Sequence, residues 1–212
     1  MSIRVSWVAL SVALWLLIGA IASYAHAAQI PDDAYKWRRA LTREAQAQWG
    51  ISAPVADFAA QIHQESAWRP DAVSRVGARG MAQFMPATAT WIAGAYPALG
   101  PTPQPANPVW AIRALVAYDR HIWDDVSAAD DCNRMAKTLS GYNGGPGWVT
   151  RDERMAGAKG LDPARWWGHV ETVNAGRSAA NWRENRGYPH RILVTLAPRY
   201  INENFGWSAC RD

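Results

Sequence analysis

The sequence predicts a mainly α-helical protein, and three features of the chain support that prediction. Apolar residues recur at intervals of three or four within residues 55–62 and again within residues 112–122, which is the period of a helix with one buried face. Residues that favour helix N-termini precede both stretches. No stretch shows the sustained alternation of apolar and polar residues that is typical of a half-buried strand.

Residues 1–27 resemble an export signal rather than a part of the fold. Arg4 is followed by an apolar run to about Ala22, and Ala25-His26-Ala27 offers the small-x-small pattern of a signal peptidase site. The apolar run is also long enough to serve as an uncleaved membrane anchor. We therefore expect one of two locations: periplasmic or secreted if the segment is cleaved, and inner-membrane anchored if it is retained.

Residues 28–212 are expected to form a single domain, since this length suits one substantial core. The whole chain carries 22 Lys and Arg residues against 18 Asp and Glu residues, a net charge of +4. Such a mild excess favours the neighbourhood of an anionic polymer, for example a cell wall or a membrane surface. The basic residues form no dense run, so we expect no binding of nucleic acid.

The first predicted helix contains the apolar stripe Val55, Phe58 and Ile62. Ser52 is a plausible N-cap for it. Pro54 would then lie in the first turn, where its missing N–H is harmless. This helix is the one that leads to residue 65.

Two more helices are predicted from their N-terminal signals. One is expected to open at Pro86 and is followed by a Pro- and Gly-rich loop over residues 97–108. Asn107 is then expected to cap a long helix that begins at Pro108. The inward residues of that helix should be Ile112, Leu115, Val116 and Ile122.

The last third of the chain gives weaker signals. Asp130 and Asp131 favour a helix N-terminus, and the glycine-rich block over residues 144–147 should end that helix. A short helix is predicted over residues 162–173, and a closing helix over Tyr188–Ile201.

Both cysteines, Cys132 and Cys210, lie beyond the predicted signal. In an oxidising compartment an even pair suggests a disulfide bond. Buried thiols, or no relationship at all, are the alternatives that the sequence leaves open.

Glu65 lies three residues beyond Ile62, on the same face of the helix as the core residues. Desolvation there disfavours the ionised carboxylate, so its pKa should rise. A carboxyl group that keeps its proton near neutral pH is what a general acid needs. A glutamate at a helix end that turns back to water is the alternative interpretation.

Four blocks of the chain resemble the soluble-type lytic transglycosylases, which belong to the lysozyme-like superfamily. They occur in the family's order: Glu65-Ser66, then Gly80-Met81-Ala82-Gln83, then Gly141-Tyr142-Asn143-Gly144, then Tyr188 within ENRGYPHRIL. Ala82 stands where the family usually has methionine, Gly141 where it has alanine, and Pro189 where valine is commoner.

The resemblance implies a lysozyme-like domain with a substrate groove and peptidoglycan glycan strands as its partner. Enzymes of this family cut the β-1,4 bond between N-acetylmuramic acid and N-acetylglucosamine and leave a 1,6-anhydro end, without a cofactor. Glu65 would serve first as acid and then as base. The residues expected to orient this glutamate and the substrate's acetamido group are Ser66, Gln83, Tyr142, Asn143 and Tyr188. Some of the eleven tryptophans beyond residue 27 would line the groove, and most would pack in the core.

Other functions remain as alternatives. A goose-type muramidase, which hydrolyses the same bond, shares the superfamily. A non-catalytic peptidoglycan-binding subunit of an envelope-spanning secretion, conjugation or phage lysis machinery is the alternative outside catalysis. No metal site is expected, because His63-Gln64-Glu65 and His169-Val170-Glu171 lack the companion motifs of zinc enzymes.

Overall fold

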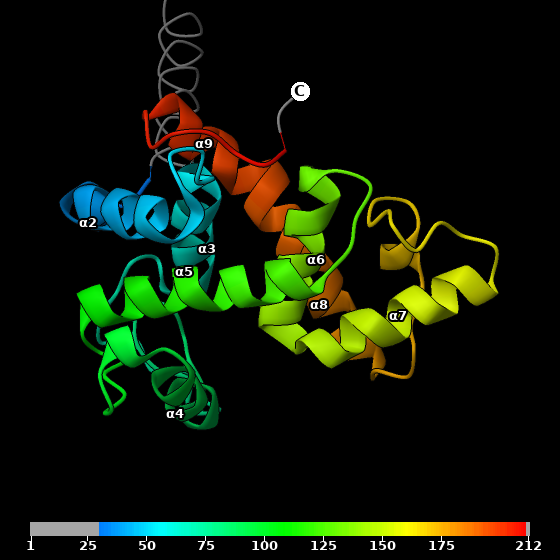
Figure 1. Cartoon of the computed structure of the whole chain (residues 1–212), viewed down its shortest axis with the longest axis horizontal. Coiled ribbons are helices and arrows are strands. Elements are labelled where there is room, and N and C mark those ends of the chain that lie inside the picture. Colours follow the sequence, from blue (N-terminus) through cyan, green and yellow to red (C-terminus); the bar gives the residue numbers. More distant parts are fainter. Residues whose placement is uncertain (1–29, 211–212) are drawn as a thin grey trace, which may run out of the picture. The chain divides into compact units, whose positions relative to one another are not determined.

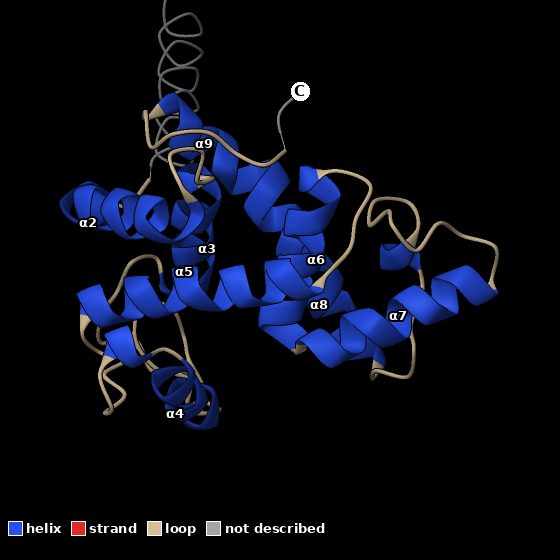
Figure 2. Ribbon diagram, viewed as in Figure 1, coloured by secondary structure: helices blue, strands red, loops and turns tan. Residues whose placement is uncertain are grey.

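Helices make up the regular structure of residues 30–210, the part of the chain that the structure, a computed structural model, describes (Figures 1 and 2). The mainly α prediction is confirmed. Within this part, β pairing is limited to two isolated antiparallel bridges, Val73–Arg79 and Arg79–Phe84. The predicted export signal lies outside the described residues. The compact unit Pro31–Asp212 is described by itself below.

The helix α2, Asp32–Trp49, is absent from the sequence-based expectations. Asp32 and Asp33 stand in its first turn, where they favour the positive end of the helix dipole. It lies beside the long helix α5, Pro108–Asp125 (Figure 1). Arg113 of α5 holds the Glu44 carboxylate of α2 through Nε–Oε2 and Nη2–Oε1 distances of 2.8 and 3.1 Å. A contact between two distant segments therefore fixes α2 in place.

The helix α3, Val55–Ser66, forms where predicted, but Ser52 does not cap it. Pro54 occupies the N-cap position and offers no side-chain hydrogen bond. The N–H group of Ala56 instead donates to the carbonyl of Trp207 at 3.2 Å. The expected Ser52 cap was wrong because the C-terminal tail satisfies this end of the helix.

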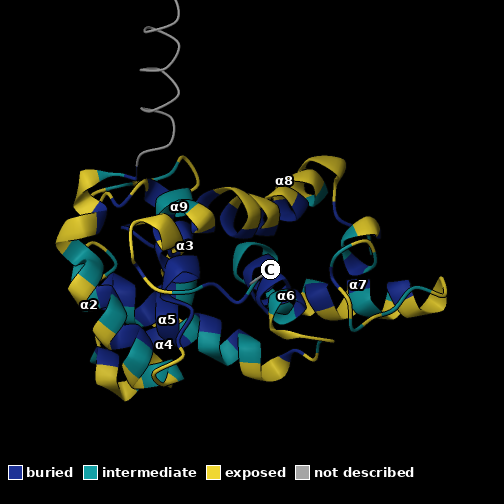
Figure 3. Ribbon diagram, turned by 90° about the horizontal axis from the view of Figure 1, so that it is seen from above, coloured by how far each residue is buried: buried dark blue, intermediate teal, exposed yellow. Residues whose placement is uncertain are grey.

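The helices α4, Pro86–Ala95, and α5 begin as predicted. The Asn107 side chain accepts hydrogen bonds from the N–H groups of Val109 and Trp110 at 3.0 and 3.2 Å. The loop between α4 and α5 contains one 3₁₀ turn, Pro97–Leu99. All four residues predicted to face inward on α5 are fully buried: Ile112, Leu115, Val116 and Ile122. Buried residues gather along α3 and α5 (Figure 3).

The helix α6, Asp131–Gly144, starts where predicted, and Asp130 caps it by accepting a hydrogen bond from the Asn133 N–H at 2.8 Å. The glycine-rich block ends it, but Pro146 at once begins a further helix, α7, Pro146–Ala158. Proline suits the first turn of a helix, so the block joins two helices. Sequence analysis did not predict α7.

The prediction of a helix over residues 162–173 is wrong. Turns fill this stretch, with a single 3₁₀ turn at Val170–Thr172. The Asn133 side-chain oxygen accepts hydrogen bonds from the N–H groups of Trp166 and Trp167 at 2.7 and 3.3 Å. These N–H groups are then not available for hydrogen bonds within a helix. Gly168 has a φ of 72°, outside the helical region.

The closing helix starts earlier than predicted, as α8, Ala179–His190. It continues through the π-helical segment Arg191–Leu196 into α9, Ala197–Asn202. Pro189 lies in the last turn of α8, two residues before the π-helical segment, and lacks a backbone N–H. The change from α to π geometry therefore occurs where proline interrupts the hydrogen-bond ladder.

The C-terminal tail is held at two adjacent positions. Cys132 of α6 and Cys210 are joined by a disulfide bond across a sequence separation of 78. The neighbouring Ala209 N–H donates to the buried Asp57 carboxyl at 2.8 Å. These contacts attach the tail to α6 and to the start of α3. No helix in the described part of the chain has the length and apolar character needed to cross a membrane.

Candidate active site

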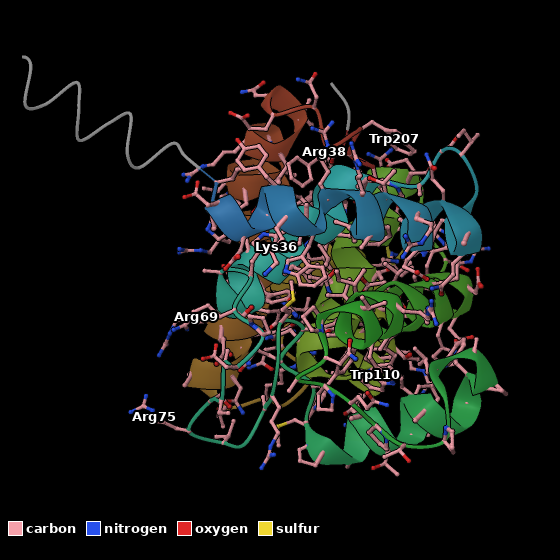
Figure 4. The ribbon with its side chains drawn as sticks, turned by 90° about the vertical axis from the view of Figure 1, so that its left-hand side faces the viewer. Lys36, Arg38, Arg69, Arg75, Trp110 and Trp207 are labelled. Atoms are coloured by element: carbon pink, nitrogen blue, oxygen red, sulfur yellow. A yellow bond between two sulfur atoms is a disulfide. The ribbon has the colours of Figure 1, made fainter. Side chains whose placement is uncertain are left out.

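Glu65 is the penultimate residue of α3 and is partly exposed where two cavities meet. The helix ends because Ala67 adopts a left-handed conformation with a φ of 51°. The chain then turns into a loop over residues 67–85, from which Arg69 and Arg75 point away from the ribbon (Figure 4). The buried face of α3 therefore delivers a carboxyl group to the edge of the core.

The two cavities have volumes of about 390 and 530 Å³. Gln83, Tyr118 and Tyr142 help to line the smaller one, and Tyr188 helps to line the larger one. Glu65 lines both. The two cavities form a groove with this carboxyl group at its centre, which we call the Glu65 groove.

Opposing effects act on the Glu65 carboxyl group. Burial raises its pKa to about 7. A hydrogen bond from the Tyr188 hydroxyl stabilises the ionised form and works against this rise. The negative charge of Glu184 adds to the rise. Burial raises the pKa of Tyr188 itself well above its ordinary value, so its hydroxyl keeps the proton that it donates.

The side chains of Tyr142 and Asn143 are fixed by bonds on the side of the groove formed by α6. The Tyr142 hydroxyl donates to the Ala82 carbonyl at 2.7 Å. The Asn143 side-chain oxygen, Oδ1, accepts a hydrogen bond from the Asn185 side-chain amide at 3.1 Å. Asn143 lines both cavities, and its own NH₂ group is the part of the side chain left to donate to a ligand.

Gln83 and Ser66 hold the loop that closes the smaller cavity. Gln83 donates from Nε2 to the carbonyls of Ala72 and Gly80 at 3.1 and 2.9 Å, and it also lines the cavity. Ser66 is buried, and its hydroxyl donates to the Met81 carbonyl at 2.9 Å. Among the residues predicted to orient the substrate, Ser66 is the one that lines neither cavity.

Gly80 allows this loop to approach its neighbour closely. A Cβ atom there would lie 1.7 Å from the Pro105 carbonyl oxygen, and the φ of Gly80 is 77°. Only glycine accommodates both the contact and this backbone conformation without strain. The position of the loop, and hence of Gln83, depends on it.

Glu184 is a groove residue that the sequence analysis missed. It lies on α8 and lines both cavities together with Glu65. It precedes Tyr188 by four residues, which places both on one face of the helix. That spacing was the signal that could have identified it. Glu184 is exposed, whereas Glu65 is mostly covered.

Two further carboxyl groups, Asp57 and Asp119, lie buried outside the groove. Asp57, Gln61 and Glu65 recur at intervals of four along α3, and the Gln61 amide donates to Asp119 of α5 at 3.3 Å. Burial raises the pKa of Asp57 to about 7 and that of Asp119 well above its usual range. Burial therefore favours the neutral form of the Asp119 carboxyl group. Among residues 30–210, no group of three or more His, Cys, Asp or Glu side chains is arranged to hold a metal ion.

Known proteins resemble this chain in sequence and in fold. The family model described as "Transglycosylase SLT domain" matches residues 40–165. Membrane-bound lytic murein transglycosylase F from Stutzerimonas stutzeri (strain A1501) is 28% identical over 151 residues, which cover 71% of this chain and 29% of that protein. The present chain thus corresponds to less than a third of that relative's length.

Two crystal structures share the arrangement of helices. The 70 kDa soluble lytic transglycosylase Slt70 from Escherichia coli has a TM-score of 0.57 at 23% identity, over 82% of this chain and 25% of that one. The inactive mutant E503Q of lytic transglycosylase Slt from Pseudomonas aeruginosa has a TM-score of 0.57 at 25% identity, with the same coverage. Since the family model matches more than half of the sequence, this lysozyme-like protein belongs to the transglycosylase SLT domain family.

Proposed function

We propose that this protein is a peptidoglycan lytic transglycosylase that cleaves the β-1,4 bond between N-acetylmuramic acid and N-acetylglucosamine, with Glu65 as its catalytic residue. The observation that carries the proposal is the Glu65 carboxyl group, which has a pKa of about 7 and lies at the centre of a groove. The family to which the chain belongs and the names of its relatives support the choice of substrate.

In the first step Glu65 acts as a general acid. Its proton moves to the bridging oxygen as the bond from that oxygen to C1 of the muramyl sugar breaks. Tyr188 orients the Glu65 carboxyl group and then stabilises the carboxylate that remains, because its hydroxyl donates a hydrogen bond to Glu65 Oε1. The substrate's own acetamido oxygen stabilises the positive charge at C1, and the Asn143 NH₂ group is placed to orient that acetamido group.

In the second step the Glu65 carboxylate acts as a base. It takes the proton of the muramyl C6 hydroxyl as the C6 oxygen bonds to C1, which closes the 1,6-anhydro ring and restores the protonated glutamate. Water is not consumed. A hydroxyl group of the same sugar also has the advantage of proximity, with effective molarities of roughly 10⁵ M or more for well-oriented groups.

A goose-type muramidase is the second candidate function, and Glu184 is the observation that favours it. Hydrolysis with inversion uses two carboxyl groups, of which one activates a water molecule. Glu184 provides a second, exposed carboxylate in the Glu65 groove. Substitution of Glu184 by Gln separates the two candidates, because a hydrolase loses its base whereas a transglycosylase keeps Glu65 for both steps.

A protein that cleaves peptidoglycan acts outside the cytoplasmic membrane, where this polymer is found. Residues 1–27 would deliver it there as a cleaved signal or hold it at the inner membrane as an anchor. The mature domain would then occupy residues 28–212. A role in wall remodelling, in a secretion or conjugation machinery, or in phage lysis is compatible with the same chemistry.

The variant Glu65→Gln tests the assignment of the acid. The amide has nearly the same shape and cannot donate the proton, so murein digestion should fall by roughly 10²–10⁴-fold. Glu203→Gln, the same change at an exposed residue outside the groove, is the matched control and should leave digestion unchanged. Near-normal digestion by a folded Glu65→Gln protein would rule the mechanism out.

A further inference from the structure

Trp91 on α4 is 46% exposed, an unusual state for the largest apolar side chain. The buried residues of α4 are Ala89, Ile92 and Ala93. Trp91 lies at the margin of this buried face: one part of its ring packs against α5, and the rest stays in solvent. An exposed indole near a groove can offer its aromatic surface to a ligand.

The helices α4 and α5 each contribute a residue to the Glu65 groove close to Trp91. Thr88 of α4 and Tyr118 of α5 both line the smaller cavity. Trp91 and His121 follow them by three residues on their respective helices, so each lies about one turn further along the same face. The ring centroids of Trp91 and His121 are 5.0 Å apart. Trp91 and His121 therefore lie about one helical turn beyond residues that line the cavity.

Neighbouring aromatic rings link Trp91 to the centre of the Glu65 groove. The centroids of Tyr142 and Tyr118 are 5.4 Å apart, and those of Tyr118 and Trp91 are 5.8 Å apart. The two rings of Trp91 and Tyr118 form a T-shaped contact, at an interplanar angle of 66°. Its neighbours thus fix the orientation of the indole and leave nearly half of the side chain in solvent.

Polar groups border the exposed indole. The His121 Nε2 atom lies 3.7 Å from the Asp125 carboxylate one turn along α5. Burial raises the pKa of Tyr96, the C-cap residue of α4, and the nearby charges of Asp124 and Asp125 raise it further. A flat apolar surface bordered by hydrogen-bonding groups suits a pyranose ring, which has apolar C–H faces and an equatorial rim of polar groups.

We propose that Trp91 is the platform of a further saccharide subsite, which binds a sugar of the same glycan strand beyond the cavity at Tyr118. This inference rests on the proposed function for the identity of the ligand. The occupant is an N-acetylated β-1,4-linked sugar, because Trp91 lies one helical turn beyond residues that line the Glu65 groove. His121 and Asp125 face the polar rim of that sugar.

Binding of β-1,4-linked N-acetylglucosamine oligomers to the Glu65→Gln protein tests this subsite without turnover. Isothermal titration calorimetry over increasing chain lengths should show a gain in affinity when the chain becomes long enough to reach Trp91. In the Trp91→Ala background this gain should shrink by roughly three- to tenfold, the range of a single aromatic contact, while shorter oligomers bind as before.

Three comparisons separate a stacking platform from other roles of Trp91. Trp91→Phe should keep part of the gain, and Trp91→Leu, which is apolar without being flat, should lose it. Tyr35→Ala removes a ring that is 47% exposed on α2 and should change nothing. An unchanged gain in Trp91→Ala, or an equal loss at all chain lengths, would overturn the proposal. Since binding is measured on an inactive protein, failure here is distinguishable from absence of murein cleavage by the wild-type protein.

Discussion

The Tyr188 hydroxyl donates a hydrogen bond to the Glu65 carboxyl group and so connects α8 with the last turn of α3. The two residues are 123 positions apart in the chain. Burial alone would push the pKa of Glu65 higher, and this bond restrains the rise to about 7. A carboxyl group with that pKa is available in both protonation states at neutral pH, which suits a residue that acts first as acid and then as base.

Tyr188→Phe should therefore move the pH profile of murein cleavage. The acid step needs protonated Glu65, so wild-type activity should fall as the pH rises through about 7. Without the hydroxyl the ionised form loses a hydrogen bond, the pKa rises further, and the alkaline limb should shift to higher pH. The maximal rate should also fall, because the carboxyl group loses its orientation.

Tyr142→Phe is the matched control for this experiment. The Tyr142 hydroxyl donates to the Ala82 carbonyl rather than to Glu65, so its loss should leave the alkaline limb in place. Initial rates measured by murein turbidity between pH 5 and pH 9 would provide both profiles. A Tyr188→Phe limb that stays in place or moves downward contradicts the role given to this hydrogen bond.

Asp57 should make the folded state less stable as the pH rises. Burial raises its pKa in the folded protein from 3.8 to about 7. The resulting stabilisation is fully present below the unfolded pKa and is lost as the pH rises through the folded pKa. Asp57→Asn cannot ionise and still offers an acceptor to the Ala209 N–H. Its free energy of unfolding should therefore fall less between pH 4 and pH 7 than that of the wild type.

Urea denaturation at several pH values measures this difference. Glu65 and Asp119 also have raised pKa values, so some decline should remain in Asp57→Asn. Asp71→Asn, at an exposed position, should retain the full wild-type decline. Identical pH dependence in Asp57→Asn and the wild type would mean that Asp57 does not titrate as its burial implies.

The disulfide between Cys132 and Cys210 should stabilise the domain by about 2–4 kcal/mol, since it closes a long loop in the unfolded chain. Replacing both cysteines by serine should lower the free energy of unfolding by that amount. Reduction of the wild type should lower it to a similar extent. Titration of the unfolded, unreduced protein with a thiol reagent should find no free thiols, and two reactive thiols would refute the pairing.

Local signals predicted the parts of the fold that depend on local contacts. Asn107 caps the helix that it was expected to cap, and Asp130 lies at the predicted start of α6, because each accepts hydrogen bonds from N–H groups two or three residues away. Ser52 failed as a cap because the competing acceptor, the Trp207 carbonyl, comes from the other end of the chain. The position of α2 depends likewise on a distant contact, between Glu44 and Arg113.

The same limit explains which groove residues were found. Glu65 and Tyr188 could be identified from the sequence blocks in which they occur. Glu184 was missed because the closing helix was predicted to start at Tyr188, whereas α8 starts at Ala179. With that boundary, Glu184 lay outside the predicted helix, and its position on the same face as Tyr188 was not apparent. Ser66 was expected in the groove, but its hydroxyl bonds to the loop.

The products of murein cleavage test the central claim most directly. Mass spectrometry of muropeptides, combined with an assay for reducing ends, should be applied to the wild type and to Glu184→Gln. If Glu65 serves both steps, both proteins should release muropeptides that are lighter by one water than the hydrolytic products, without new reducing ends. Reducing ends that appear in step with cleavage and disappear in Glu184→Gln would contradict the claim and identify a hydrolase.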